Sequence, residues 1–242
     1  MSLYGRDPLY TYGAIRNLQL HRCFLPDWTI RIYTLQPSDD LPKHLAVPQP
    51  VLDKLTVLGA ELVYLNSSYI NVEPRLWRFL VADDVSVTHF LIRETHARLN
   101  AKYETLVKAW LDTSSPFFCC RDKDAQFALT AGTLGAERKV FVTLLGKSVE
   151  NIIRTQRFYV NESPSDEDNA HESNIALPSR KIGDAFVDQI LDPIYQAGAK
   201  CYDDKRSAAK WSNSQPFPFR VDTYGNDTLG AAFNQFELKH KA

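Results

Sequence analysis

The six residues Arg93–Arg98, which read RETHAR, combine groups that bind anions with groups that bind metals or move protons. Glu94 and His96 lie two positions apart, and two such residues in an extended segment project to the same side. A carboxylate and an imidazole placed in this way can share a divalent cation. The alternative is an ordinary strand end, at which Glu94 pairs with an arginine and His96 lies at the surface.

Four arginines surround this pair in the sequence, and together they indicate a site for a phosphate or a diphosphate. Arg93 and Arg98 flank Glu94 and His96, and Arg75 and Arg78 lie three positions apart on a predicted helix, so that both can point the same way. Planar guanidinium groups bind phosphate oxygens through two hydrogen bonds at once.

The elements that must position these residues alternate between short apolar strands and helical patterns. Predicted strands cover 29–35, 61–65, 87–92 and 116–120, and predicted helices cover 50–60, 74–84 and 100–112. A further strand ends near Tyr4 and Gly5. This order predicts an α/β fold with a mostly parallel sheet and helices on both faces. Ligands bind beyond the carboxyl ends of the strands in such sheets, which is where Arg93–Arg98 lie.

The second half of the chain is less regular. Residues 144–158 predict a helix, 184–199 predict a helix interrupted near Pro193, and 214–234 resemble a loop. The acidic, apolar-poor stretch 161–174 predicts an exposed and mobile loop. No clear linker divides the sequence, so that we expect one domain over residues 1–242.

Composition excludes several classes of function. The net charge of −1 gives no global support for nucleic-acid binding. No apolar run reaches the ~18 residues of a membrane span, and the first residues do not resemble a signal peptide, which favours a cytoplasmic protein. The four cysteines form no CxxC pair and predict reduced, mostly buried thiols. The GxGxxG, GxxxxGK[ST], GxSxG and HExxH motifs are absent, so that a dinucleotide or P-loop site has no support.

Several segments together resemble a family of viral and bacterial glycosyltransferase-like proteins that have a GT-A, or nucleotide-diphospho-sugar transferase, fold. The similar segments are Tyr12–Leu20, Pro26–Trp28, Arg75–Phe79 and Arg93–Arg98, together with 187–195, 216–220 and 224–233. The resemblance covers most of the chain. It implies a nucleotide-sugar half over residues 1–122 and an acceptor-side half over 123–242.

The resemblance also implies roles for individual residues. The arginines would bind the diphosphate of a nucleotide sugar, and Tyr4 and Gly5 would contact its base and ribose. Glu94 and His96 stand where the family has a metal-binding Asp-x-Asp, a change that suits Mn²⁺ or Zn²⁺ better than Mg²⁺. Tyr202 stands where the family has a histidine. A glycan or another hydroxyl compound would be the acceptor, and Asp122 and Asp188 are candidate general bases.

Three interpretations of the altered motif remain open at this point. The protein is an active transferase that works without a metal, or Glu94 and His96 hold a different metal, or the fold binds a nucleotide, glycan or protein partner without catalysis. A different enzyme of phosphorylated substrates could also use the arginine cluster. Similarity of fold does not choose among these interpretations.

Overall fold

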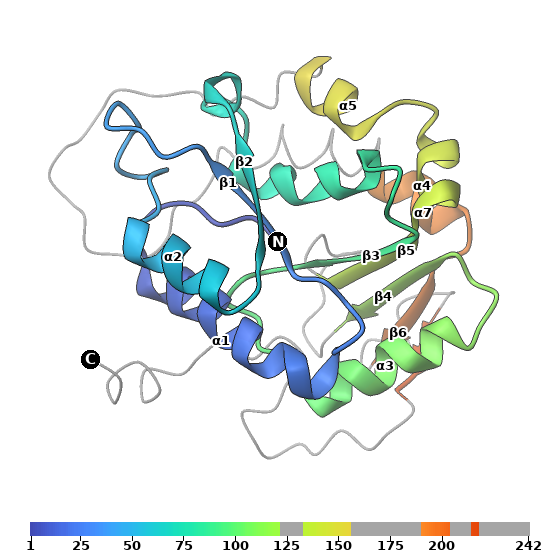
Figure 1. Ribbon diagram of the computed structural model, residues 1–242. Helices are drawn as coiled ribbons and strands as arrows, with labels where there is room; N and C mark the ends of the chain where they lie inside the picture. The colour runs from blue at the N-terminus through green and yellow to red at the C-terminus, as the bar shows by residue number, and fades with distance from the viewer. Residues whose placement is uncertain (122–132, 156–189, 204–213, 218–242) are drawn as a thin grey trace, which may run out of the picture.

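The computed structural model describes residues 1–121, 133–155, 190–203 and 214–217, which form a mixed α/β structure (Figure 1). The strands are β1 (Arg31–Leu35), β2 (Glu61–Leu65), β3 (His89–Arg93), β4 (Phe117–Arg121), β5 (Thr133–Glu137), β6 (Lys200–Asp203) and β7 (Ser214–Pro216). The α-helices are α1 (Pro8–Phe24), α2 (Gln49–Val57), α3 (Ala101–Leu111), α4 (Arg138–Leu145), α5 (Val149–Thr155) and α7 (Asp192–Gln196). Two 3-10 helices, η1 (Ser67–Tyr69) and η2 (Pro74–Asp83), precede β3.

The strands form two sheets. β1 and β2 pair in parallel, and Ser2 forms an isolated parallel bridge with Tyr33 of β1. The larger sheet has the order β3-β5-β4-β6-β7, in which β5 runs antiparallel to both β3 and β4, whereas β4, β6 and β7 are parallel. The predicted α/β class is therefore confirmed. The larger sheet is mixed rather than mostly parallel, because it contains the antiparallel strand β5, which the sequence analysis did not predict.

Both faces of the larger sheet are covered. All five residues of β4 are buried, and the first four alternate between two apolar clusters. Phe117 and Cys119 pack with η2, α4, α5 and α7 on one face, whereas Phe118 and Cys120 pack with α1 and α3 on the other. The near-continuous apolar run of β4 is what a strand buried on both faces requires.

Local signals in the sequence explain where the helices around the site begin. Asp7 caps α1 by accepting a hydrogen bond from the Leu9 amide at 2.8 Å, and Pro8 follows at the first helical position. Asn100 caps α3 in the same way, accepting from the Tyr103 amide at 2.9 Å. These caps set the start of α1 shortly after Gly5 and the start of α3 shortly after Arg93–Arg98.

Three predicted elements differ from the structure. The predicted helix 74–84 is the 3-10 helix η2, because both helix types share nearly the same periodicity over a few turns. The predicted helix 144–158 is divided between α4 and α5, since α4 ends at Gly146, whose φ of 64° is left-handed. Residues 214–216 form β7 inside a predicted loop. The predicted mobile loop 161–174 lies outside the described residues.

The cysteines correct a further expectation. Cys119 of β4 and Cys201 of β6 are directly opposite each other on neighbouring strands and form a disulfide, so that the prediction of four reduced thiols is wrong. Cys23 is free and exposed, and Cys120 is buried. Among the helices of the described segments, none combines the length and the apolar character that a membrane crossing requires.

Candidate functional site

The RETHAR segment begins at the last residue of β3 and continues into a turn. The Ala97 amide donates a hydrogen bond to the Glu94 carbonyl oxygen at 3.3 Å, which closes the turn. Glu94 and His96 therefore do not lie in the extended segment that the sequence predicted, and the expectation that they project side by side from a strand is wrong.

Helix α1 holds this turn in place through two residues to which the sequence analysis gave no role. The buried Asn17 side chain donates from Nδ2 to the carbonyl oxygens of Thr95 at 2.8 Å and Ala97 at 3.0 Å. Its Oδ1 accepts from the Leu99 amide at 2.8 Å. Gly13 lies one turn earlier, where an added Cβ would be only 2.6 Å from the Thr95 carbonyl oxygen. Gly13 and Asn17 both belong to the Tyr12–Leu20 segment. Their spacing of one helical turn was the signal in the sequence that could have identified them.

An ion pair dominates the start of the turn. Arg78 of η2 is buried, and its Nη1 donates to Glu94 Oε1 at 2.7 Å. Burial acts to raise the pKa of Glu94, but the charge of Arg78 and its hydrogen bond outweigh burial and hold this pKa below its usual value. The backbone of Arg78 is fixed as well, because its amide donates to Ser2 Oγ at 3.0 Å. Glu94 is therefore an ionised partner of an arginine at neutral pH.

A small recess gathers part of the predicted site. Its lining residues are Ser2, Tyr4, Tyr10, Arg75, Arg78, Glu94 and Thr95. Arg75 is 40% exposed and donates from Nε to Glu73 Oε1 at 2.8 Å. The volume is only about 10 Å³, which accommodates about one water molecule. The structure thus brings together Tyr4, Arg75, Arg78 and Glu94, as the sequence predicted, but in a closed arrangement.

Arg93, Arg98 and Gly5 lie apart from this recess. Arg93 Nη2 donates to the carbonyl oxygens of Ala97 at 3.0 Å and Arg98 at 3.3 Å, and its guanidinium stacks 3.8 Å above the Tyr103 ring. Arg98 is half-buried and does not line the recess. Gly5 adopts a φ of 70° in the turn before α1, a conformation that favours glycine, so that a structural role accounts for this residue.

Glu94 and His96 do not form an open metal site in this arrangement. Arg78 already holds the Glu94 carboxylate, and a divalent cation there would have to displace the guanidinium. The His96 ring contacts the Tyr10 ring edge-on at 5.3 Å, its Nδ1 is buried without a hydrogen bond, and burial lowers its pKa. Within the described ranges, no group of three or more metal-ligating side chains comes together. The metal role of the two residues stays a prediction.

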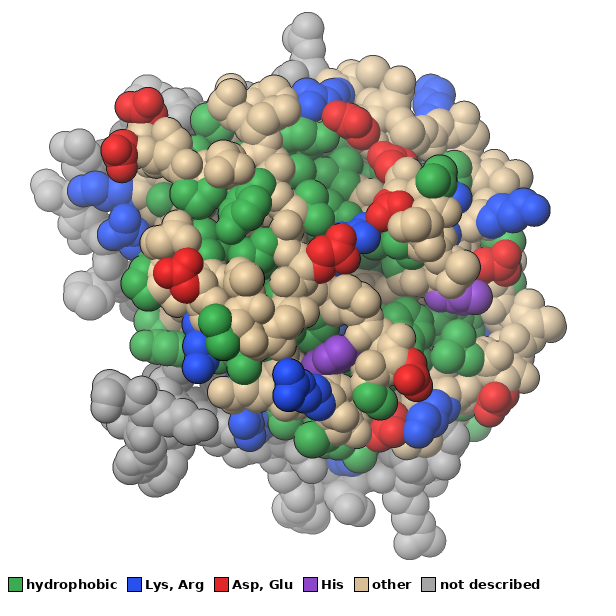
Figure 2. Space-filling model, viewed as in Figure 1, with side chains coloured by type: hydrophobic (Ala, Val, Ile, Leu, Met, Phe, Trp, Pro, Cys, Tyr) green, Lys and Arg blue, Asp and Glu red, His purple; other side chains and the backbone are tan. Residues whose placement is uncertain are grey.

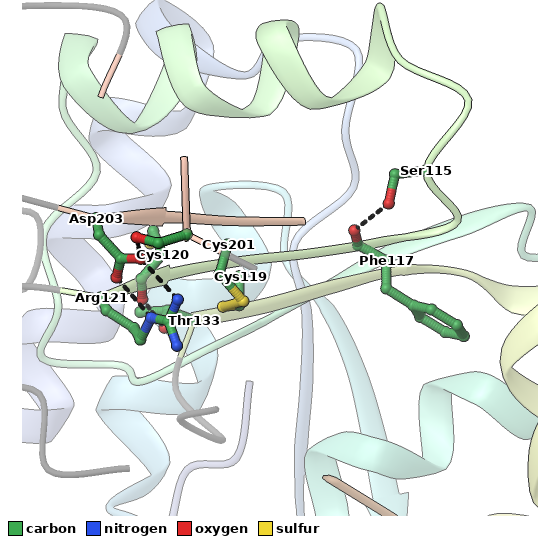
Figure 3. The surroundings of a disulfide bond; sticks show 9 residues. Ser115, Phe117, Cys119, Cys120, Arg121, Thr133, Cys201 and Asp203 are labelled. Atoms are coloured by element: carbon green, nitrogen blue, oxygen red, sulfur yellow. Dashed lines mark hydrogen bonds and ion pairs between the residues drawn. A yellow bond between two sulfur atoms is a disulfide. The ribbon is translucent and has the colours of Figure 1, made fainter. Parts of the chain in front are cut away.

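A second charged cluster lies at the carboxyl ends of β4 and β6 (Figure 3). Arg121 and Asp203 are fully buried and form a two-fold contact, with Arg121 Nε 2.5 Å from Oδ1 and Nη2 2.6 Å from Oδ2. Ser214 of β7 also donates to Asp203. Asp203 follows Tyr202, the residue that replaces the histidine of the resemblance. Asp122 and Asp188, the predicted general bases, lie outside the described residues.

A scan against protein-family models, a search of curated proteins and a search of solved structures each find no match for this chain. The resemblance to glycosyltransferase-like proteins therefore rests on the sequence segments alone, and the GT-A fold stays a prediction. The described residues establish a mixed α/β structure with an arginine–glutamate pair at the end of β3.

Proposed function

We propose that this protein is a glycosyltransferase-like protein that binds the diphosphate of a nucleotide sugar with arginine side chains in place of a metal ion. The observation that supports this proposal most is the ion pair between Arg78 and Glu94, at 2.7 Å. In this proposal, the Arg78 guanidinium beside Glu94 takes over the task of a metal that would neutralise phosphate charge. Arg75 and Tyr4 lie beside this pair in the same recess.

The chemistry requires positive charge where the diphosphate leaves the sugar. Two guanidinium groups can stabilise the negative charge that develops on the leaving oxygen, which is the task that a divalent cation performs in metal-dependent transferases. Arg75 suits this role because its side chain is 40% exposed and its partner, Glu73, lies only two residues away. A recess of about 10 Å³ must open to admit a diphosphate.

The donor is a nucleotide sugar and the acceptor a glycan or another hydroxyl compound in this proposal. An inverting transfer needs a general base for the acceptor hydroxyl, and Asp122 and Asp188 remain the candidates from the sequence. Tyr4 borders the recess, so that it is the candidate contact for the nucleoside. Burial raises the pKa of Tyr4 to about 12, and its phenol is therefore neutral at pH 7.

The proposal is tested by calorimetric titration of UDP and GDP in the presence of EDTA, and then with Mn²⁺. We expect binding that survives EDTA and that weakens by about 10-fold or more in Arg75→Ala, since a charge-assisted hydrogen bond contributes about 1.5–3 kcal/mol. Arg154→Ala is a matched control, because Arg154 is 39% exposed and its Nε lies 2.9 Å from Glu150. Equal binding by both variants would place the diphosphate elsewhere, and binding that requires Mn²⁺ would restore the metal site.

A second candidate function is binding without catalysis. It is favoured because Arg78 and Arg93 already form contacts within the protein. Arg78 and Arg93 are both 3% exposed, and each already binds protein oxygen atoms. A protein of this kind would bind UDP or GDP, yet release no nucleoside diphosphate from nucleotide sugars over hours. The same titration, followed by chromatography of the nucleotide, separates the two functions.

A further inference from the structure

An asparagine motif follows strand β2 directly. Asn66, Ser67 and Ser68 read Asn-x-Ser, and the middle residue is not proline. This pattern is the acceptor sequence for N-linked oligosaccharides. Two further copies of the motif, at 161–163 and 226–228, lie outside the described residues. Three residues of this kind also occur together by chance, so that the surroundings of Asn66 must decide whether the motif can be used.

The turn after β2 holds this motif at the surface. Asn66, Ser67 and Ser68 are all exposed, whereas the flanking residues Leu65 and Tyr69 are buried. In Figure 2, the upper edge of the molecule, where β2 ends in Figure 1, presents polar side chains and backbone to solvent. An attached oligosaccharide is bulky and requires such a surface position. The two buried neighbours anchor the turn and leave the motif accessible.

The Asn66 amide uses one of its two polar atoms for folding. Asn66 caps η1, and its Oδ1 accepts hydrogen bonds from the Ser68 amide at 3.0 Å and from the Ser68 hydroxyl at 2.5 Å. Within the described residues, Nδ2 of Asn66 donates to no protein atom. N-glycosylation replaces a hydrogen of Nδ2 and keeps Oδ1 as an acceptor. The modification and the helix cap therefore use different atoms of the same amide.

The other asparagines of the described residues lack this combination. Asn17 is buried, and its Nδ2 donates to two backbone carbonyl oxygens. Asn100 caps α3 through Oδ1, as Asn66 caps η1, but no hydroxyl residue stands two positions after it. The same absence holds for Asn71 and Asn151. Among the residues that the structure describes, only Asn66 joins exposure and an available Nδ2 to a hydroxyl two positions later.

The Cys119–Cys201 disulfide gives independent evidence about the compartment in which the chain folds. Disulfides persist in oxidising compartments, such as the lumen of the endoplasmic reticulum, and are rare in the cytosol. N-linked oligosaccharides are attached to proteins in that same lumen. A cytoplasmic location, which the sequence favoured, does not account for this bond. The disulfide and the motif lie in separate parts of the sequence, and both indicate the secretory route.

We propose that Asn66 is a site of N-linked glycosylation and that this chain folds in the lumen of the secretory pathway. The donor is an oligosaccharide linked to a lipid diphosphate. The bond between C1 of the first sugar and the diphosphate oxygen breaks, and a bond between C1 and Asn66 Nδ2 forms. The lipid diphosphate leaves with the electron pair of the broken bond, and Nδ2 gives up one proton. Another enzyme performs this transfer, so that the proposal does not depend on nucleotide-sugar binding by this protein.

The first test uses the protein isolated from the cells that make it naturally. Peptide N-glycosidase in water labelled with heavy oxygen converts each glycosylated asparagine to an aspartate that carries the label. We expect tandem mass spectrometry to find the label at position 66. The peptide that contains Asn66 is read separately from those that contain 161–163 and 226–228. An unlabelled asparagine at position 66 would overturn the proposal.

Three variants, secreted as full chains from insect cells behind a cleavable leader, separate the motif from the turn. Asn66→Asp keeps an oxygen acceptor for the Ser68 amide and removes Nδ2, and Ser68→Ala removes the hydroxyl that the motif requires. Ser67→Ala is the matched control, because it changes an exposed serine of the same turn and leaves the motif complete. We expect the glycan at position 66 to be lost in the first two variants and kept in Ser67→Ala.

The thiol count of each secreted chain shows whether folding and modification go together. We expect two free thiols in the parent and in all three variants, since the motif lies apart from the Cys119–Cys201 bond in the sequence. A glycan at position 66 that survives Ser68→Ala would overturn the proposal. So would a folded, disulfide-bonded parent with an unmodified Asn66, or a glycosylated parent with four free thiols.

Discussion

The contact between Arg78 and Glu94 determines what the end of β3 can do. The Glu94 carboxylate is 31% exposed, whereas the arginine that it contacts is almost completely buried. A buried guanidinium without its carboxylate would leave an uncompensated charge, so that the pair is maintained as a unit. Any ligand that binds here competes with an internal partner rather than with water.

We expect Glu94→Gln to lower the free energy of unfolding at pH 7 by about 1–3 kcal/mol, since it leaves Arg78 without its charged acceptor. The folded-state pKa of Glu94 is depressed, so that its contribution is present above its usual pKa of 4.5 and is lost as the pH falls through the lower, folded value. Urea unfolding of parent and variant at pH 7 and pH 3 checks this expectation. A difference that grew toward pH 3 would contradict it.

Sequence reasoning predicted part of this site at the level of single residues. It placed Tyr4, Arg75, Arg78 and Glu94 near one another, because residues at strand ends and on one helix face meet in an α/β fold. It did not predict that Arg93 turns toward Tyr103. The direction of a long side chain depends on its neighbours in space, and the sequence around Arg93 does not specify them.

At the scale of elements, α1 positions the site by packing against the turn after β3. Gly13 permits this approach, since its missing side chain leaves room for the Thr95 carbonyl. Asn17 then donates hydrogen bonds to the Thr95 carbonyl and, together with Arg93 Nη2, to the Ala97 carbonyl. Hydrogen bonds from Asn17 of α1 thus take the place of strand pairing for the backbone that follows β3.

We expect Gly13→Ala to destabilise the protein by about 1–3 kcal/mol, although alanine is the better helix former. An added Cβ would lie 2.6 Å from the Thr95 carbonyl oxygen and 2.9 Å from the His96 Cα, and backbone atoms on both sides cannot rotate away. Gln19→Ala, on the exposed face of the same helix, should change stability by less than about 0.5 kcal/mol. Thermal unfolding of both variants provides the comparison, and a stabilised Gly13→Ala would show that the helix can move.

The elements themselves were predicted unevenly. The strands at 29–35, 61–65, 87–92 and 116–120 correspond to β1–β4, because each is a short apolar run between turn residues. Strand β5 was missed since TLGAE has little β-propensity of its own. Gly135 lies against Leu91, Phe118 and Trp110, where an added Cβ would be 2.9–3.1 Å from their side chains, so that packing explains this strand better than propensity does.

At the scale of the whole molecule, the larger sheet joins segments that are distant in the sequence. β4 and β6 are neighbours although they lie on either side of about eighty residues, and the Cys119–Cys201 disulfide and the Arg121–Asp203 pair connect them directly (Figure 3). Cysteine spacing did not predict this bond, because the partners are 82 residues apart and meet only through strand order.

We expect two thiols to react with an alkylating reagent in denaturant without a reductant, namely Cys23 and Cys120, and four after reduction. Reduction should also lower the free energy of unfolding by about 2–4 kcal/mol, since the closed loop no longer restricts the unfolded chain. Intact mass after alkylation gives the count, and urea unfolding with and without dithiothreitol gives the energy. Four reactive thiols before reduction would show that the bond does not form.

The disulfide also changes what a break in the chain means. A protease that cuts once anywhere between Cys119 and Cys201 separates the polypeptide into two pieces, but the sulfur–sulfur bond keeps them in one covalent molecule. Such a cut protein would migrate as an intact chain on a non-reducing gel and as two fragments on a reducing one. Cleavage and dissociation are therefore separate events in this protein, because the two pieces can separate only after a reductant has broken the disulfide.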